Sequence, residues 1–184
     1  MQTFAVQSLV RAQGAAVRGV SSQKNAAVIA PGEFAPDFDL PALVGGVKKR
    51  FRLHEQLEKT VVVLAFYPLN WEPLSGRQLA EYQAERSSFV PNTEVVGISV
   101  DSIMNTTVWE RDIGPLEYPL CSDFWPHGEV SHLYGVFRDT GPAAGASERA
   151  VFVVDRSGKV VFRKVYGLQQ LPPLRETLEA LRER

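Results

Sequence analysis

The sequence predicts an α/β domain in which helices flank a mixed central sheet. Two runs of apolar, largely β-branched residues, 61–67 and 94–100, are typical of strands buried on both faces. A segment with helical periodicity follows each run, and a hairpin turn at Asp155-Arg156-Ser157-Gly158 joins two later strands. Strands that alternate with helices, followed by a hairpin and a last helix, indicate this fold class.

The first half of the domain contains an entry segment and the first buried strand with its helix. Pro68 ends this strand, and Pro73 suits the first turn of the helix, whose apolar residues Leu79, Tyr82 and Phe89 share one face. The expected elements are a short edge strand or β-turn at 35–40, a glycine turn at 45–46, one helical turn at 53–57, the strand at 61–67 and a helix at 74–89.

In the second half, the sequence again alternates between strand and helix. Asp101-Ser102 offers a cap for the helix that begins at Ile103, and Pro172-Pro173 opens the final helix. The expected elements are a strand at 94–100, a helix at 103–113, a short strand at 118–121, a short helix at 127–134, strands at 150–154 and 160–165, and a helix that turns Leu174, Leu178 and Leu181 inward.

Composition excludes several classes of function. The 184 residues carry a net charge of −1, so no general field attracts nucleic acid. No apolar run reaches the length of a membrane-spanning helix. Cys121 is the single cysteine, which rules out an internal disulfide. This fits either a reducing compartment or a domain that needs no disulfide for stability.

The first thirty residues differ from the rest of the chain. They contain Arg11, Arg18 and Lys24 but no acid, and serines are scattered among apolar residues. This is the composition of a mitochondrial transit segment. The alternative is an arm that packs on the domain or on a partner. We therefore divide the chain into an N-terminal arm, residues 1–30, and a domain, residues 31–184, and expect an intracellular, cytoplasmic or mitochondrial protein.

The turn after the first buried strand is the first place to look for chemistry. Sites in open α/β sheets form where central strands end and helices begin. Ser75 falls in the first helical turn, where unpaired backbone N–H groups and the helix dipole favour an anion. A thiol at this position would ionise readily.

The segment Phe66-Tyr67-Pro68-Leu69-Asn70-Trp71-Glu72-Pro73-Leu74-Ser75 resembles the active-site loop of peroxiredoxins, of the alkyl hydroperoxide reductase and thiol-specific antioxidant type. Four other segments resemble family motifs in the right order: Ala35-Pro36-Asp37-Phe38, residues 97–102, residues 119–130 and Ser147-Glu148-Arg149-Ala150 with the strand that follows. The resemblance implies a thioredoxin-like redoxin domain that reduces hydroperoxides with a thiol reductant, without metal or organic cofactor. It also implies association, either with further copies or within a larger assembly.

The resemblance assigns four site residues. Pro68 matches the loop proline, and Ser75 stands at the position of the peroxidatic cysteine. Glu72 stands at the position of a threonine or serine, while Arg149 matches the arginine that binds peroxide. A serine hydroxyl cannot be oxidised to a sulfenic acid. Glu72 adds a negative charge that would repel a thiolate or pair with Arg149. These two departures predict an inactive or nearly inactive protein and favour a natural loss of activity.

Several residues admit a functional and a structural interpretation. Arg149 is either an anchor for a peroxide oxygen or an ion-pair partner for Glu72 or Glu148. Cys121 is either a displaced redox residue or, as we favour, a buried apolar side chain on a strand toward the sheet edge. The five-residue spacing of His127 and His132 does not suit a metal site.

The tryptophans are assigned to packing. Without a basic stripe, Trp71, Trp109 and Trp125 are not a platform for nucleic-acid bases. Trp71 is the exception, because it borders the active-site loop and the resemblance implies a region through which peroxiredoxins often associate.

The leading hypothesis is therefore a peroxiredoxin-family protein without peroxidase activity. The alternative is a structural or interaction subunit that uses the same fold in a larger assembly. A third hypothesis makes Glu72, Ser75 and Arg149 a hydrolytic site, although no histidine base is expected in this region.

Overall fold

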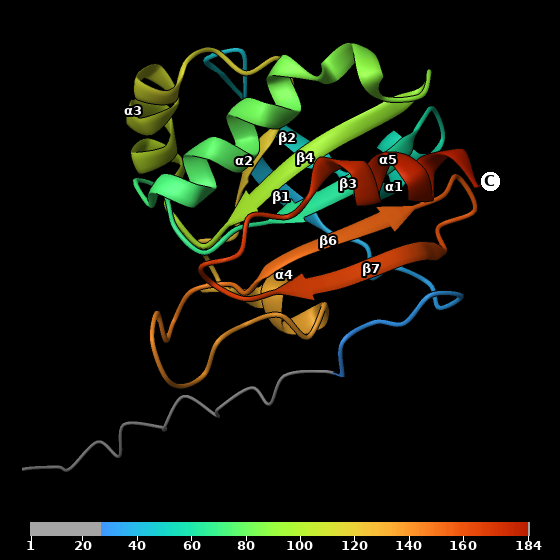
Figure 1. Ribbon diagram of the computed structural model, residues 1–184. Coiled ribbons are helices and arrows are strands. Elements are labelled where there is room, and N and C mark those ends of the chain that lie inside the picture. The colour runs from blue at the N-terminus through green and yellow to red at the C-terminus, as the bar shows by residue number, and fades with distance from the viewer. Residues whose placement is uncertain (1–26, 184) are drawn as a thin grey trace, which may run out of the picture.

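The computed structural model describes residues 27–183 of the chain. The predicted arm lies outside these residues except for 27–30, of which Val28 and Ile29 pack against the core of the domain. The described residues form one seven-stranded sheet in the order β2-β1-β5-β4-β3-β6-β7, with helices on both faces (Figure 1).

The elements follow the predicted alternation of strands and helices. In chain order they are β1 (Asp39–Val44), β2 (Val47–Arg52), α1 (Leu53–Leu57), β3 (Val61–Phe66), α2 (Pro73–Ala84), a 3₁₀ turn (Arg86–Ser88), β4 (Thr93–Ser99), α3 (Ile103–Ile113), β5 (Leu120–Ser122), α4 (Glu129–Leu133), β6 (Arg149–Val154), β7 (Val160–Tyr166) and α5 (Leu174–Arg182).

The sheet is mixed, as predicted. Strands β3, β4 and β5 are parallel neighbours, with Val63 opposite Val95 and Gly97 opposite Leu120. Strand β6 adds to β3 in the antiparallel direction, and β7 adds to β6. The parallel strands therefore direct their carboxyl ends to one edge of the sheet, where the loop after β3 lies.

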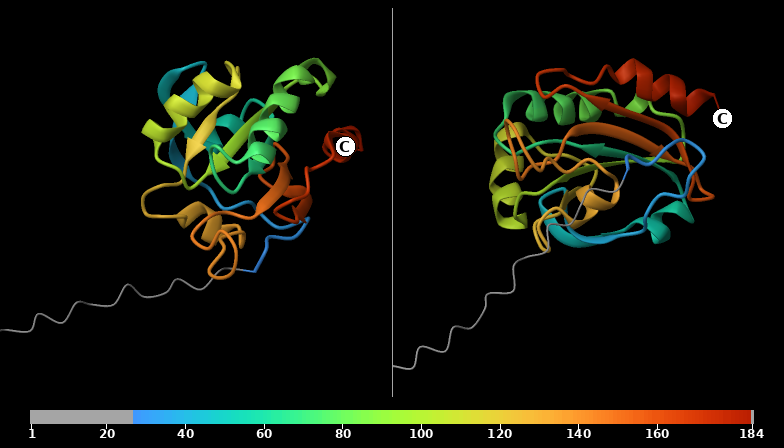
Figure 2. Two further views of the ribbon diagram at one scale, coloured as in Figure 1. Left: turned by 60° about the vertical axis from the view of Figure 1, so that its left-hand side comes forward. Right: turned by 90° about the horizontal axis from the view of Figure 1, so that it is seen from below.

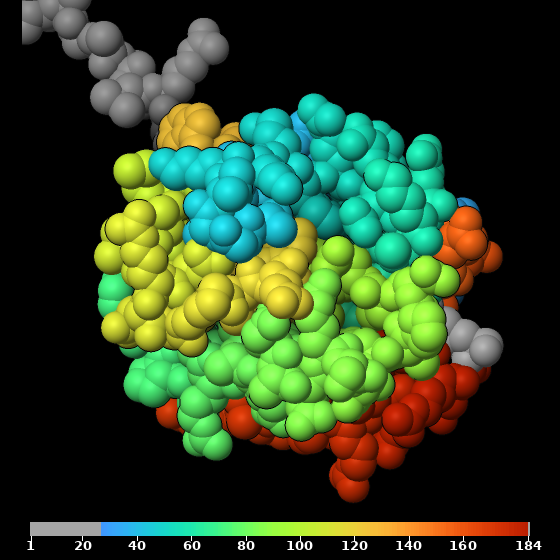
Figure 3. Space-filling view, turned by 90° about the horizontal axis from the view of Figure 1, so that it is seen from above, coloured from blue at the N-terminus to red at the C-terminus, as the bar shows by residue number. Residues whose placement is uncertain are grey.

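Two apolar cores lie on opposite faces of the sheet. One lies under α2, α3 and α5, and its members include Trp109, Tyr82 and Leu181. The other lies under α1 and α4 and contains Phe66 and Tyr134. The two layers of helices are separated by the sheet in both views of Figure 2. Figure 3 looks onto the face of the sheet that α2 and α3 cover, and it shows α2 (green) beside α3 (yellow).

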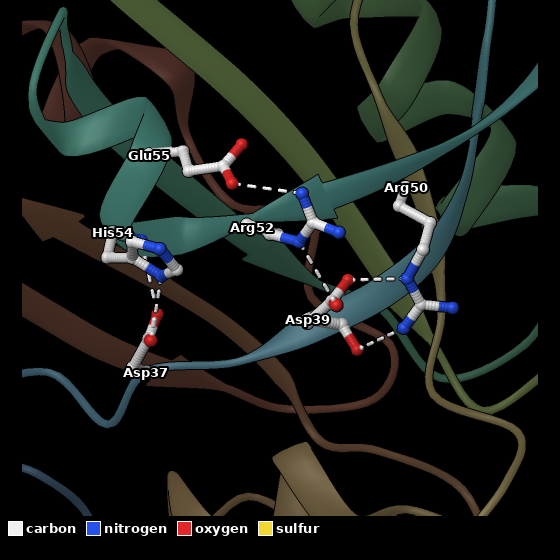
Figure 4. A network of polar contacts seen from close by, with 6 residues as sticks. All are labelled: Asp37, Asp39, Arg50, Arg52, His54 and Glu55. Atoms are coloured by element: carbon white, nitrogen blue, oxygen red, sulfur yellow. Dashed lines mark hydrogen bonds and ion pairs between the residues drawn. The ribbon is translucent and has the colours of Figure 1, made fainter.

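Strand β2 was not predicted, because its sequence Val-Lys-Lys-Arg-Phe-Arg has almost no buried side chain. It forms an edge of the sheet and is held through charges (Figure 4). Asp39 on β1 accepts hydrogen bonds from Arg50 at 2.7 Å and from Arg52 at 3.2 Å. Arg52 also donates to Glu55 on α1. A charged edge strand resists pairing with other chains, but it carries no hydrophobic alternation for sequence analysis to detect.

Three further expectations need correction. Helix α2 ends at Ala84 and a 3₁₀ turn follows it, so the predicted helix at 74–89 was too long. Helix α4 begins at Glu129 because Gly128 adopts a left-handed backbone conformation. The strand that carries Cys121 is not toward the edge, since β5 lies between β1 and β4. Among residues 27–183, none of the helices is long and apolar enough to span a membrane.

Candidate active site

The loop between β3 and α2 is held by a network of amide and carboxylate groups centred on Asn70. The backbone N–H of Asn70 donates to Asp101 at 2.8 Å, and its side-chain amide donates to Asn105 at 2.8 Å and to Thr106 at 3.1 Å. The hydroxyl of Tyr67 donates to the Asn70 side-chain oxygen at 3.1 Å. These contacts fix the loop against the end of β4 and the first turn of α3.

Trp71, the next residue, has a strained backbone. Its φ of 64° lies in the left-handed region, which a bulky residue rarely adopts. Its indole N–H donates to the same Asn105 oxygen at 3.1 Å, while about half of the side chain (51%) stays exposed. Asn105 thus holds two successive loop residues and directs the chain into α2.

Glu72 is the N-cap of α2, and its carboxylate is the centre of the site. Its oxygens accept hydrogen bonds from the backbone N–H groups of Leu74 at 3.1 Å and Ser75 at 2.7 Å. The hydroxyl of Ser75 donates to the same carboxylate at 2.7 Å. An acidic side chain at this place satisfies N–H groups that the helix itself leaves unpaired.

Arg149, the first residue of β6, completes the site from below α2. Its guanidinium is fully buried and donates to Glu72 at 2.8 Å, to Gln78 at 3.1 Å and to the carbonyl of Leu168 at 3.1 Å. Its contact with the Ser75 hydroxyl is longer, at 3.5 Å. These contacts come from α2, its cap and the segment after β7.

The charge on Glu72 is stabilised by these contacts. Partial burial raises the pKa of this carboxyl, but the hydrogen bonds from Ser75, Arg149 and two backbone N–H groups outweigh burial and hold the pKa below its ordinary value of 4.5. At neutral pH the site therefore contains a carboxylate paired with a guanidinium.

The structure thus brings together three of the four predicted site residues. Ser75, Glu72 and Arg149 are in mutual hydrogen-bonding contact, and Arg149 has Glu72 as its ion-pair partner. Glu148, the other candidate partner, pairs instead with Arg138 at 2.6 Å. Pro68 is buried in the same loop.

Sequence reasoning missed the residues that position the loop. Asn70, Asp101 and Asn105 are polar side chains at the ends of a strand or the start of a helix, and this placement is a usable signal for a site. The carbonyl of Leu168 had no such signal, because any residue supplies a backbone carbonyl.

The remaining candidates lie outside this cluster. Cys121 is fully buried, and burial together with the nearby Asp123 raises the pKa of its thiol well above the ordinary value. His127 contacts the carbonyl of Gly145, and His132 stacks on Phe137. Within residues 27–183, no group of three or more histidine, cysteine or acidic side chains is placed to hold a metal ion.

Comparison with curated proteins finds relatives that are peroxiredoxins or alkyl hydroperoxide reductases. Peroxiredoxin-2 of Bos taurus is 35% identical over 158 residues, which cover 82% of this chain and 75% of that protein. A chloroplastic 2-cysteine peroxiredoxin of Chattonella marina var. antiqua is 33% identical over 144 residues, 74% of this chain and 71% of that protein. Alkyl hydroperoxide reductase E of Mycobacterium tuberculosis is 33% identical over 133 residues, 66% of this chain and 84% of that protein.

Solved structures confirm the thioredoxin-like α/β fold. The reduced 2-Cys peroxiredoxin of Plasmodium vivax matches with a TM-score of 0.75 and 25% identity, over 85% of this chain and 81% of that one. The mitochondrial 2-cys peroxiredoxin of Plasmodium falciparum gives the same TM-score and identity over 84% of this chain and 93% of that one. The family model of the AhpC/TSA family matches residues 31–163. The chain therefore belongs to the AhpC/TSA family, the peroxiredoxins.

Proposed function

We propose that this chain is a peroxiredoxin-family protein that does not reduce hydroperoxides. The observation that carries the proposal is the contact between Glu72 and Arg149, with 2.8 Å between carboxylate and guanidinium. The family resemblance implies that, in active relatives, the arginine at the position of Arg149 polarises a peroxide oxygen. The cysteine at the position of Ser75 supplies the attacking thiolate in those relatives. Here the guanidinium is already paired with an internal anion.

The chemistry of Ser75 supports the same conclusion. Reduction of a hydroperoxide by a peroxiredoxin needs a sulfur that accepts an oxygen atom, and a hydroxyl group has no such redox chemistry. The one cysteine, Cys121, is buried on β5 with a raised thiol pKa, so it does not present a thiolate in its place.

The hydrolytic alternative is weakened by the geometry. Ser75 donates to Glu72 in the manner of a nucleophile and its base, but Ser75 is fully buried. The lowered pKa of Glu72 also makes this carboxylate a poor proton acceptor.

A direct test measures peroxide consumption with a dithiol reductant for the wild-type protein and for Ser75→Cys with Glu72→Thr. Wild type should not exceed the rate without protein. The double variant should consume peroxide faster than that background rate, because it regains a sulfur and loses the competing carboxylate. Consumption by wild type at the rate of an ordinary thiol peroxidase would refute the proposal.

A second candidate function is that of a subunit that associates with further copies of this chain. Four large apolar side chains near the loop are exposed: Leu69 (39%), Trp71 (51%), Phe124 (50%) and Trp125 (82%). Leu69 and Phe124 line the same hollow, with a volume of about 370 Å³. Exposed apolar side chains that gather on one surface are typical of an interface, and the family resemblance implies association.

Light scattering on a size-exclusion column tests the second candidate. Phe124→Ser combined with Trp125→Ser should lower the mass of the assembly. Val47→Ser, which removes an exposed apolar side chain on the edge strand β2, is the matched control and should leave the mass unchanged. An unchanged mass in the double variant would contradict an interface at this surface.

A further inference from the structure

Strand β2 carries a short basic segment on a chain whose net charge is only −1. Its sequence Val-Lys-Lys-Arg-Phe-Arg places four cations within five consecutive positions. All four side chains are exposed: Lys48, Lys49, Arg50 and Arg52. We call these four side chains the basic edge, because β2 forms one edge of the sheet.

The two arginines of the basic edge are paired with acids. Asp39 on β1 contacts Arg50 at 2.7 Å and Arg52 at 3.2 Å (Figure 4). Glu55 on α1 contacts Arg52 at 2.9 Å. Two acids therefore neutralise part of the charge that the four cations carry.

The two lysines leave the rest of that charge uncompensated. Among residues 27–183, neither Lys48 nor Lys49 forms an ion pair. The Nζ atom of Lys48 contacts the sulfur of Met104 on α3 at 2.9 Å, and this contact supplies no negative charge. The basic edge thus keeps an excess of positive charge that an acidic partner would complement.

The outer side of β2 also presents free backbone groups. At the end of the hairpin, the Leu53 N–H donates to the Phe38 carbonyl at 3.1 Å, in register with the pairs of β1 and β2. Hydrogen-bonded and non-hydrogen-bonded pairs alternate along an antiparallel hairpin. This bond therefore directs the N–H and C=O groups of Lys48 and Arg50 away from β1. In the described part of the chain, no strand lies beyond β2 to bind them.

An extended acidic segment fits both features of this edge. Its backbone could bond to the free groups of Lys48 and Arg50, as in recognition by strand addition. Successive side chains of a strand point to opposite faces, so Lys49 lies on one face while Lys48 and Arg50 lie on the other. Consecutive acids, rather than alternating ones, would meet all three cations.

Other occupants are less well matched. A second copy of β2 would place like charges side by side, which is unfavourable. Residues 1–26 of this chain contain no acid and cannot supply the complementary charge. Nucleic acid would be repelled by Asp39 and Glu55, and its phosphodiester groups have no donor for the free carbonyl groups of Lys48 and Arg50.

We propose that β2 is a docking edge for an extended acidic segment of another protein, which adds to the sheet as a further strand. The charge that keeps β2 from pairing with its own kind selects a strand of opposite charge. The proposal is independent of peroxidase activity, because the basic edge shares no residue with the contact between Glu72 and Arg149.

The test uses the full chain and a synthetic peptide in which four consecutive glutamates lie between threonine and valine residues, which favour strands. Fluorescence anisotropy of the labelled peptide measures binding, which added salt should weaken. Hydrogen exchange by NMR measures the backbone. On binding, the N–H groups of Lys48 and Arg50 should exchange more than tenfold more slowly. The N–H groups of Lys49 and Phe51, which face β1, should change much less.

Variants separate charge from backbone pairing, and a cooperative thermal melt checks that each is folded. Lys48→Gln with Lys49→Gln should weaken binding severalfold. Arg163→Gln with Arg175→Gln removes the same charge from exposed positions elsewhere and should bind as wild type does. Lys48→Pro removes an outward N–H without removing a bond to β1, so it should bind more weakly than Lys48→Gln.

Three results would overturn the proposal, and all of them come from wild type. The first is a peptide that does not bind at low salt. The second is a peptide that binds without slowing exchange at Lys48 and Arg50. The third is a single-stranded RNA of equal charge that binds the basic edge more tightly than the peptide does, which would assign this surface to nucleic acid.

Discussion

Glu72 and Arg149 lie 77 positions apart in the chain, yet the carboxylate Oε2 atom and the guanidinium Nη2 atom are 2.8 Å apart. The contact joins the cap of α2 to the first residue of β6. Because Arg149 is fully buried, its charge needs a partner inside the protein. Glu72 supplies that partner. Under the proposed function, the same contact takes up the guanidinium that would otherwise bind a substrate oxygen.

The influence of Glu72 on a restored thiol is the first prediction. In Ser75→Cys, the thiol would lie beside the Glu72 carboxylate, which favours the protonated form, so its pKa should be higher than in Ser75→Cys with Glu72→Thr. In the double variant, the helix N-terminus and Arg149 favour the thiolate, and the pKa should fall below the ~8.5 of free cysteine.

Peptide-resolved alkylation rates against pH measure this thiol separately from Cys121. A double variant that titrates like free cysteine, or one whose thiol pKa equals that of the single variant, would show that the site does not favour an anion as described.

Acid should weaken the Glu72 contact. Burial raises the pKa of Glu72, but its hydrogen bonds lower the pKa by more than burial raises it. The net pKa therefore lies below the ordinary value of 4.5. A group whose pKa is lowered on folding stabilises the protein above its unfolded pKa, and this contribution is lost as the pH falls through the folded pKa. Glu72→Gln should therefore cost about 1–3 kcal/mol of unfolding free energy at pH 7, and the cost should shrink below pH 4.5.

Urea unfolding at a series of pH values gives this difference directly. Glu55→Gln serves as the control, since an exposed ion pair contributes only ~0–1 kcal/mol. A difference between wild type and Glu72→Gln that stays constant down to the acid limit of folding would contradict the assigned charge state.

Cys121 should be inert in the folded protein. Its side chain is fully buried, and burial raises its thiol pKa, so reagent and thiolate are both excluded. A disulfide reagent should label Cys121 in denaturant and leave it unlabelled in native buffer over the time needed to label an exposed thiol. Rapid native labelling would reopen the interpretation of Cys121 as a displaced redox residue.

The N-terminal arm should contribute to association rather than to the stability of the domain. Val28 and Ile29 pack against the core, so the deletion that tests the arm removes residues 1–26 only. Ordering a residue costs about 1–2 kcal/mol of backbone entropy, and the few large apolar side chains of this segment return ~1.5–3 kcal/mol each. The melting temperature should change little, while light scattering should show weaker association. A large drop in melting temperature with an unchanged assembly would assign the arm to the core.

The sequence was most informative where a feature depends on the residues of one short segment alone. The apolar runs of β3 and β4, Pro73 at the start of α2 and Ser102 at the cap of α3 all carry local signals that the structure confirms. Ser102 accepts a hydrogen bond from the Asn105 backbone N–H, as an N-cap residue does.

Contacts between distant segments could not be predicted in the same way. The side chain of Asn70 meets that of Asn105 only after β3 and β4 pair, and the Leu168 carbonyl reaches Arg149 from the segment after β7. Strand β2 has charged residues where hydrophobic alternation would be expected. Such features depend on tertiary packing, which overrides local propensity.

The rate of hydroperoxide consumption tests the central claim most directly. Wild type, Ser75→Cys, and Ser75→Cys with Glu72→Thr are compared with hydrogen peroxide and an organic hydroperoxide in the presence of a dithiol. The account predicts no rate above background for wild type, a small rate for the single variant and a larger one for the double variant, because the carboxylate then no longer competes for Arg149. A wild-type rate equal to that of an ordinary thiol peroxidase, or a single variant as fast as the double variant, would contradict it.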